Sequence, residues 1–177
     1  MRPQKIKLNK HKDSRGYLLE LLPKKLRKKF KYSIITKSKK KVIRGIHYDQ
    51  KMKEEKLVYV VKGKILDVCV DISKFDNIKK KIFYNKLNEG EAIFIPKKFA
   101  HGYACLGKEN ILIYFLSKVY DHKTNKGIKW SDKSLKIKWK IKNPIISKKD
   151  KRLPTLFSNK WKKFLFLVEK ENLLNQY

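Results

Sequence analysis

The sequence predicts an all-β protein, built either as a closed barrel or as two packed sheets, with a jelly roll among the candidates. Three observations indicate this class. Apolar and polar residues alternate at period two along much of the chain, and helical spacing is rare. Glycine- and asparagine-containing turns separate the alternating segments. The 177 residues are 41% hydrophobic and 12% aromatic, which is enough for a packed core despite a formal net charge of +31.

The predicted elements follow one another in short segments. Leucines and lysines at residues 21–30 indicate a short helix, and a strand follows at 32–36. The clearest segment is a hairpin, with strands at 57–61 and 65–71 joined by a turn at Lys62-Gly63-Lys64. Further strands are expected at 81–87, 92–96, 102–106 and 111–117, with turns around Gly90 and Gly107. Apolar residues at helical spacing over 164–174 predict a terminal helix that packs on the barrel.

The chain is expected to form one domain over residues 1–177, because neither a linker nor an internal repeat divides it. No apolar run approaches the roughly 20 residues of a transmembrane helix, and the basic start lacks the apolar stretch of a signal peptide. Cys69 and Cys105 lie in strand-like apolar segments and are expected to be buried free thiols. These features predict a cytoplasmic protein without a membrane partner.

The positive charge comes almost entirely from lysine. The only arginines are Arg2, Arg15, Arg27, Arg44 and Arg152. Proteins that read nucleic acids favour arginine for bidentate and stacking contacts, and this chain contains no groove-reading motif. Its lysines are spread along the whole sequence, so we interpret them as solvated surface and expect no nucleic-acid partner. The charge should nevertheless attract small anionic substrates.

Two histidines, His47 and His101, lie in strand-like segments and are the first candidates for chemistry. Two strands of one small barrel can bring both imidazoles into its interior. Imidazole titrates near neutral pH and therefore suits a general base that removes a proton from carbon. A buried carboxylate can fix its tautomer and stabilise the imidazolium. Taken alone, a histidine on a strand is usually structural.

A metal site is an alternative for the same residues. The spacing from Gly90 through Pro96 to His101 resembles the second motif of the cupin superfamily, whose metal-binding members use histidines and a glutamate. The first cupin motif requires His-x-His, and here Asp49 occupies the place of the second histidine. The ligands of such an iron or zinc site would be His47, Asp49, Glu54 and His101.

Several blocks of sequence carry a more specific resemblance. In chain order they are Asp13-Ser14-Arg15-Gly16-Tyr17, Arg44-Gly45-Ile46-His47-Tyr48, Lys56-Leu57-Val58, Phe99-Ala100-His101-Gly102-Tyr103, Tyr114, Tyr120-Asp121, Gly127-Ile128-Lys129-Trp130-Ser131-Asp132 and the segment from Pro144 to Asp150. In this order they resemble the dTDP-4-dehydrorhamnose 3,5-epimerase family. The resemblance implies a cupin-type jelly-roll barrel with short flanking helices, one near the C-terminus, that needs no metal and no cofactor. It also implies a homodimer with exchanged N-terminal strands.

The resemblance implies an activity and a role for each matching residue. The substrate would be a nucleoside-diphosphate 4-keto-6-deoxy sugar used in cell-surface polysaccharide synthesis, inverted at C3, C5 or both. His47 would be the base, oriented by Asp150. Tyr114 would deliver a proton to the opposite face. Lys56 would stabilise the enolate oxygen, because a cation placed there binds the transition state more tightly than the ground state.

The same resemblance implies the residues that bind the substrate. Arg15 and Arg44 would hold the diphosphate, whereas His101, Glu20 and Tyr120 would line the site. Arg15 and Glu20 lie in the N-terminal strands that cross to the partner subunit in this family, so they would act in trans.

The chain departs from the family pattern on the strand before Arg44. The family usually carries Gln-x-Asn and then Ser-x-Ser there, and this chain has Tyr32, Ile34, Thr36 and Ser38, with Asp49 in place of a later glutamine. Apolar groups in place of polar ones should change how the site discriminates among sugar hydroxyls. A single-site epimerase for a GDP-linked heptose, a 3,4-ketoisomerase and a non-enzymatic binding barrel therefore remain alternatives.

Overall fold

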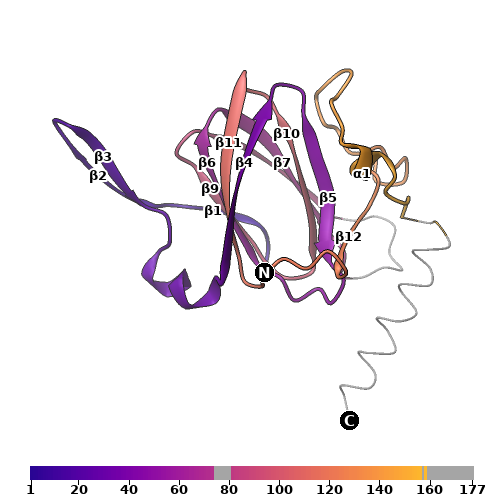
Figure 1. Ribbon diagram of the computed structural model, residues 1–177, viewed down its shortest axis with the longest axis horizontal. Coiled ribbons are helices and arrows are strands. Elements are labelled where there is room, and N and C mark those ends of the chain that lie inside the picture. The colour runs from indigo at the N-terminus through magenta and orange to yellow at the C-terminus, as the bar shows by residue number, and fades with distance from the viewer. Residues whose placement is uncertain (74–80, 157, 159–177) are drawn as a thin grey trace, which may run out of the picture.

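Two five-stranded antiparallel sheets pack face to face in the computed structural model, which describes residues 1–73, 81–156 and 158 (Figure 1). The first sheet has the order β1-β9-β6-β11-β4, and the second has the order β12-β5-β10-β7-β8. The bounds in the first sheet are Gln4–Ile6, Ala92–Ile95, Lys56–Lys62, Glu109–Leu116 and Tyr32–Lys39. Those in the second are Asn125–Gly127, Ile43–Asp49, Phe99–Cys105, Lys64–Asp71 and Ile82–Asn88. The predicted jelly-roll class is confirmed.

The core lies between the two sheets, and a second apolar layer covers the outside of the second sheet. Strand β11 buries every second residue, including Leu112 and Tyr114, as expected for a strand with one face in the core. Strand β7 buries six consecutive residues, because the segment that carries Leu135 and Trp139 covers its outer face. Both cysteines are buried and free, as predicted.

The predicted central hairpin is confirmed as β6 and β7, joined at Gly63. Gly63 has a φ of +94°, and a Cβ there would collide with the carbonyl oxygen of Glu109, so only glycine fits this turn. The other predicted strands are also present, with ends that differ by a few residues. Strand β12 was not predicted, β5 was expected only as a strand-like segment around His47, and the N-terminal strands were expected only through the family resemblance.

A two-stranded hairpin, β2 (Asn9–Asp13) and β3 (Gly16–Glu20), projects from the barrel as an arm (Figure 1). Its strands pair only with each other. Tyr17 and Leu18 on this arm are exposed in the single chain. Because apolar side chains are rarely left exposed together on an isolated arm, this pattern is typical of a surface that meets another chain.

The helices are short. The short helix predicted at residues 21–30 is a 3₁₀ helix, η1 (Lys24–Lys29). Helix α1 (Lys148–Lys151) has four residues and begins at the N-cap Ser147, whose Oγ accepts the backbone N–H of Asp150. The terminal helix predicted at 164–174 lies outside the described residues.

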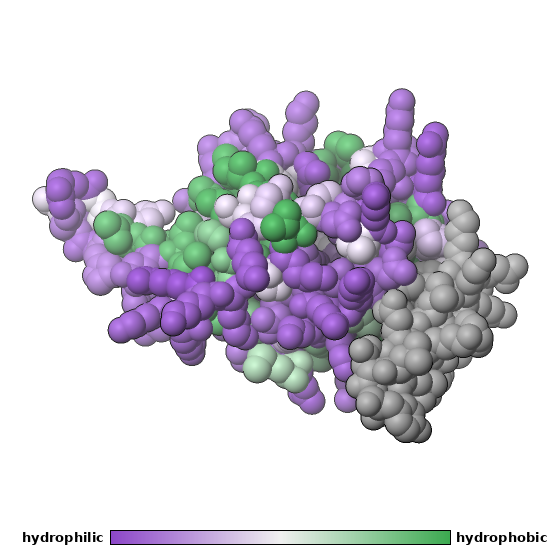
Figure 2. Space-filling view, turned by 60° about the horizontal axis from the view of Figure 1, so that its bottom comes forward, coloured by the Kyte–Doolittle hydropathy of each residue, from purple (hydrophilic) through white to green (hydrophobic). Residues whose placement is uncertain are grey.

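Hydrophilic side chains cover most of the face seen in Figure 2, with smaller hydrophobic areas between them. This agrees with the interpretation of the lysines as solvated surface. Within residues 1–73, 81–156 and 158, no helix has the length and apolar character needed to cross a membrane.

Candidate active site

A cavity of about 540 Å³ lies at one end of the barrel, between the two sheets and helix α1. Strands β4, β5, β6, β10 and β11 contribute to its walls, together with residues 145–150. Seven of the nine residues predicted for the site line it: Arg44, His47, Lys56, His101, Tyr114, Tyr120 and Asp150. Residues separated by up to 106 positions in the sequence therefore meet in one space.

His47 and Asp150 form the central pair. His47 Nε2 lies 2.8 Å from Asp150 Oδ1, and the backbone N–H of Gly45 donates to Asp150 Oδ2 at 3.2 Å. Burial alone would raise the pKa of Asp150, but the hydrogen bond and charge of His47, assisted by Gly45, hold this pKa below its ordinary value. An ionised Asp150 accepts a hydrogen bond from the N–H at Nε2, which leaves Nδ1 of His47 as the nitrogen with a free lone pair. This is the arrangement of an oriented general base.

Gly45 explains how β5 reaches this geometry. It has a φ of +111°, and a Cβ there would lie 2.7 Å from the Cα of Gly102 and from the carbonyl oxygen of His101. Two glycines facing each other therefore let β5 and β10 approach closely beside the two histidines. The motif Arg44-Gly45 serves strand packing at this point.

Tyr114 is buried and lies on β11, in the sheet that faces the sheet of His47. Both residues line the same cavity. Burial raises the pKa of its phenol well above the ordinary value, and the neighbouring Tyr103 raises it further. The phenol is consequently protonated at neutral pH and can donate a proton. Its ring packs edge-on against His101, with 6.1 Å between the ring centroids.

Lys56 supplies a cation inside the cavity. Its Nζ lies 2.6 Å from Oε2 of Glu54, and both side chains are almost fully buried. A buried ammonium group requires such a partner, because desolvation otherwise outweighs its attraction to other groups. The pair fixes the direction of Lys56 and leaves further ammonium protons for a ligand oxygen.

Arg44 and Tyr120 lie toward the outer part of the cavity lining. Arg44 Nε donates to Ser38 Oγ at 3.0 Å, and its Nη2 donates to the carbonyl oxygen of Lys37 at 3.4 Å. Tyr120 is partly exposed, and its hydroxyl accepts a hydrogen bond from Lys149 Nζ at 3.4 Å. Arg44 and Lys149 are therefore available to an anionic ligand.

His101 belongs to a second histidine–aspartate pair, deeper in the barrel. Its Nε2 lies 2.5 Å from Asp67 Oδ2, and Cys69 Sγ donates to Asp67 Oδ1 at 3.3 Å. Among the described residues, these three form the only His, Cys, Asp or Glu group compact enough to hold a metal ion. Their polar atoms already satisfy one another through hydrogen bonds.

The ligand set of the metal alternative does not come together. His47 pairs with Asp150, Glu54 with Lys56, and His101 with Asp67. Asp49 accepts hydrogen bonds from the Lys53 backbone N–H and from Lys118 Nζ. The four residues of that set are thus directed to four different partners, and that interpretation of the sequence was wrong.

Comparison with known proteins identifies the family of the chain. The family model described as dTDP-4-dehydrorhamnose 3,5-epimerase matches residues 4–158. The chain belongs to this family. It is 35% identical over 148 residues to the dTDP-4-dehydrorhamnose 3,5-epimerase of Shigella flexneri, covering 78% of this chain and 82% of that protein. It is therefore similar to an isomerase over most of the length of both chains, and the sequence resemblance is confirmed.

Two further proteins are similar to this chain. A spore coat polysaccharide biosynthesis protein of Bacillus subtilis is 31% identical over 140 residues, or 75% of this chain and 91% of that protein. The crystal structure of dTDP-4-dehydrorhamnose 3,5-epimerase from Bacillus anthracis, with TDP and PPi bound, superposes with a TM-score of 0.80 at 30% identity. That superposition covers 87% of this chain and 94% of the other.

Arg15 and Glu20, the two remaining predicted residues, lie on the arm of this epimerase and not in the lining of its own cavity. The Arg15 side chain is 88% exposed and pairs with Asp13, 2.6 Å between Nη2 and Oδ2. Glu20 accepts a hydrogen bond from Asn9 and lies 3.8 Å from Arg27. A single chain therefore presents a cavity without these two groups.

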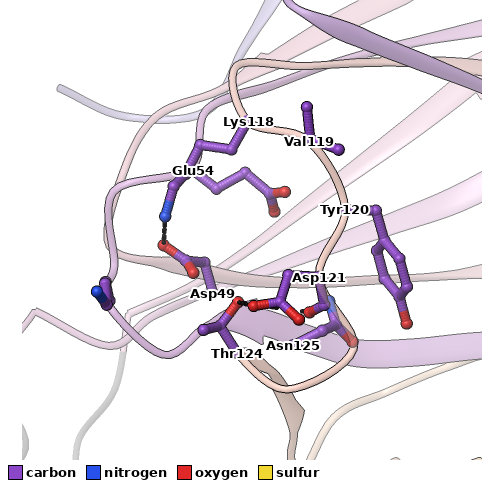
Figure 3. Close-up of a pocket in the computed structure, with 9 residues that line it drawn as sticks. Asp49, Glu54, Lys118, Val119, Tyr120, Asp121, Thr124 and Asn125 are labelled. Carbon is purple, nitrogen blue, oxygen red and sulfur yellow. Dashed lines mark hydrogen bonds and ion pairs between the residues drawn. The ribbon is translucent and has the colours of Figure 1, made fainter.

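A smaller pocket of about 190 Å³ adjoins the cavity of the epimerase (Figure 3). The two share Glu54, Tyr120 and Asn125. Asp49, the residue that replaces the family's glutamine, lies in this pocket with its Oδ2 3.1 Å from Lys118 Nζ (Figure 3). The departure at Asp49 thus changes the neighbouring pocket and not the His47 pair.

Three residues of the epimerase cavity had no assigned role in the sequence analysis. Glu54 appeared there only as a metal ligand, and Tyr103 and Lys149 appeared only as members of motif blocks. The signal for Glu54 was its position two residues before Lys56, which places both side chains on the same side of an extended segment. Tyr103 and Lys149 carried no such signal, because their partners, Thr36 and Tyr120, are distant in the sequence.

Proposed function

We propose that the chain inverts C3, C5 or both of a nucleoside-diphosphate 4-keto-6-deoxy sugar, with dTDP as the nucleotide. The observation that carries this proposal is the meeting of four groups around one cavity: the oriented base His47–Asp150, the buried cation Lys56 and the phenol Tyr114. The related epimerase of Bacillus anthracis has TDP and PPi bound, which supports this choice of nucleotide.

The reaction requires each of these groups. His47 Nδ1 removes the proton from a carbon beside the ketone, and the electron pair moves to the ketone oxygen. Lys56 stabilises the charge that develops there, at a position with little competing solvent. Tyr114 then returns a proton to the opposite face of the carbon, which inverts it. This sequence of steps uses only side chains of the protein, so the proposal includes neither a metal nor a cofactor.

Inversion can be measured by NMR in deuterated water. The substrate dTDP-4-keto-6-deoxyglucose is incubated with the protein, and C3 and C5 are followed for deuterium and for configuration. Label with inversion at both carbons supports a 3,5-epimerase, and label at one carbon supports a single-site epimerase. A product with the ketone moved to C3 would favour the ketoisomerase instead. If neither this substrate nor its GDP- and CDP-linked counterparts exchanges a proton, the chain is not this enzyme.

We also propose that the working form is a homodimer in which the arm completes the partner's site. Support comes from the exposed Arg15, Tyr17 and Leu18 on the arm. The test mixes two inactive variants, Arg15→Ala and Asp150→Asn. If the arms exchange, half of the dimers are hybrids with one intact site, and about one quarter of wild-type activity returns. If each arm serves its own chain, mixing restores nothing.

The cellular setting is part of the proposal. A nucleotide sugar is a cytoplasmic metabolite class, and two buried free thiols suit a reducing compartment. The relationship to a spore coat polysaccharide biosynthesis protein supports a product destined for a polysaccharide.

A further inference from the structure

The hydroxyl group of Tyr103 has no part in the function proposed above, although it reaches the same cavity. Tyr103 lies on β10, is 1% exposed, and lines the cavity. Its hydroxyl lies 3.1 Å from Thr36 Oγ1 on β4. Phenylalanine would fill the same space without a polar atom to satisfy, so the buried phenol needs a reason beyond packing.

Tyr103 also lies beside the acid of the proposed reaction. The ring centroids of Tyr103 and Tyr114 are 6.3 Å apart. Burial raises the pKa of Tyr114 most, and the charge and hydrogen bonding of Tyr103 raise it further. Arg44 lowers the pKa of both phenols. The hydrogen-bonded hydroxyl groups of Thr36 and Tyr103 therefore lie next to Tyr114, whose ring packs against that of Tyr103.

The epimerase chemistry creates a need for such a series. Each inversion takes a proton onto His47 and removes one from Tyr114. The enzyme must restore both groups before the next inversion. A phenolate at Tyr114 is strongly disfavoured because the residue is buried. A sugar bound in the cavity covers Tyr114, which lines that cavity, so reprotonation before the next inversion needs a route through neighbouring side chains.

We propose that Thr36 and Tyr103 are positioning residues that return the proton to Tyr114 after each inversion. The proposal rests on the function proposed above. The Tyr103 proton passes to the Tyr114 phenolate as the Thr36 proton passes to Tyr103. Thr36 takes a proton from water in the cavity, and the hydroxide left behind is neutralised by the proton that His47 releases. Arg44 stabilises the negative charge while it moves along the hydroxyl groups.

The test separates the first inversion from later ones. Tyr103→Phe keeps the ring, and Thr36→Val keeps the shape of the side chain, while each removes one hydroxyl. With enzyme in excess over dTDP-4-keto-6-deoxyglucose, the first inversion should proceed at the wild-type rate, because Tyr114 starts protonated. With substrate in excess, a burst of one inversion per site should precede turnover slowed by on the order of ten- to a hundred-fold.

Three controls make the result specific. Tyr84→Phe removes the hydroxyl of an exposed tyrosine that accepts the Lys138 backbone N–H, and should show no burst. Thr36→Ser retains a hydroxyl and should lose less turnover than Thr36→Val. The double variant Tyr103→Phe with Thr36→Val should be no slower than either single variant, because both interrupt one route.

Each outcome has one meaning. A burst in both hydroxyl variants supports the relay. Wild-type turnover in Tyr103→Phe, or a first inversion slowed as much as later ones, overturns it. An inactive wild-type protein overturns the function proposed above, which distinguishes that failure from failure of the relay alone. Thermal unfolding followed by circular dichroism verifies that each variant is folded.

Discussion

The barrel contains two histidine–aspartate pairs that use the same chemical groups in different surroundings. In the first, His47 Nε2 lies 2.8 Å from Asp150, and the histidine side chain is 29% exposed toward the cavity. In the second, His101 Nε2 lies 2.5 Å from Asp67, and the two side chains are 5% and 0% exposed. Strands β5 and β10 set His47 directly opposite His101 in the sheet.

The difference lies in what surrounds each pair. Asp150 comes from a four-residue helix after the barrel strands and leaves one imidazole nitrogen of His47 free. Asp67 comes from within the barrel and also accepts a hydrogen bond from Cys69. A base must reach both the substrate and, between turnovers, water. We therefore propose that the open pair transfers the proton and that the closed pair supports the cavity wall.

The largest expected effect comes from His47→Asn. Loss of the base should reduce deuterium incorporation at the substrate carbons by at least about 10²- to 10⁴-fold. The free energy of unfolding should fall by less than in His101→Asn, because Asp150 keeps the hydrogen bond from the Gly45 N–H and the His47 side chain is already 29% exposed. The measurement is exchange by NMR in deuterated water. If His47→Asn exchanged protons at the wild-type rate, the open pair would not contain the base.

The closed pair should respond in the opposite way to His101→Asn. The carboxyl group of Asp67 would remain buried without its imidazole partner, at a cost of about 3 kcal/mol in the free energy of unfolding. The measurement is urea denaturation. Adding Asp67→Asn to this variant should recover part of the loss, since the orphaned carboxyl is removed. A stability loss larger in His47→Asn than in His101→Asn would break the comparison.

A smaller effect is expected from pH, through Asp150. Its pKa in the folded protein is lowered from 3.8, so the carboxylate contributes stability that is fully present above that value. This contribution is lost as the pH falls through the lowered pKa. The difference in unfolding free energy between wild type and Asp150→Asn should therefore shrink below pH 3.8. A difference that stays constant on acidification would show that the pairing of Asp150 does not stabilise the fold.

The strands of the barrel could be predicted from local pattern, and the pairing of its polar groups could not. Residues 57–61 and 65–71 alternate or run apolar between clear turns, and they form β6 and β7. Strand β5 carries Arg44 and Gly45 among apolar residues. These two residues interrupt the alternation of apolar and polar residues from which the bounds of a strand are predicted. The arm strand β2 reads as a charged loop because no core lies against it in this chain.

Some site residues could likewise be selected from the sequence, and others depended on contacts between distant segments. His47 and His101 stood out by type, because few histidines occur in the chain. Asp150, flanked by lysines, could be selected only through the family resemblance. The Glu54 partner of Lys56 and the Thr36 partner of Tyr103 depend on register between distant strands. Such contacts follow from tertiary structure, which local pattern does not encode.

The central claim is that base and acid act from opposite faces of one bound sugar, and Tyr114→Phe tests it most directly. This variant keeps the His47 pair and the aromatic wall, and it removes only the proton that inversion requires. In deuterated water, NMR should detect label entering the substrate carbon with its configuration retained. Inversion at the wild-type rate in Tyr114→Phe would contradict the account, because another group would then be delivering the proton.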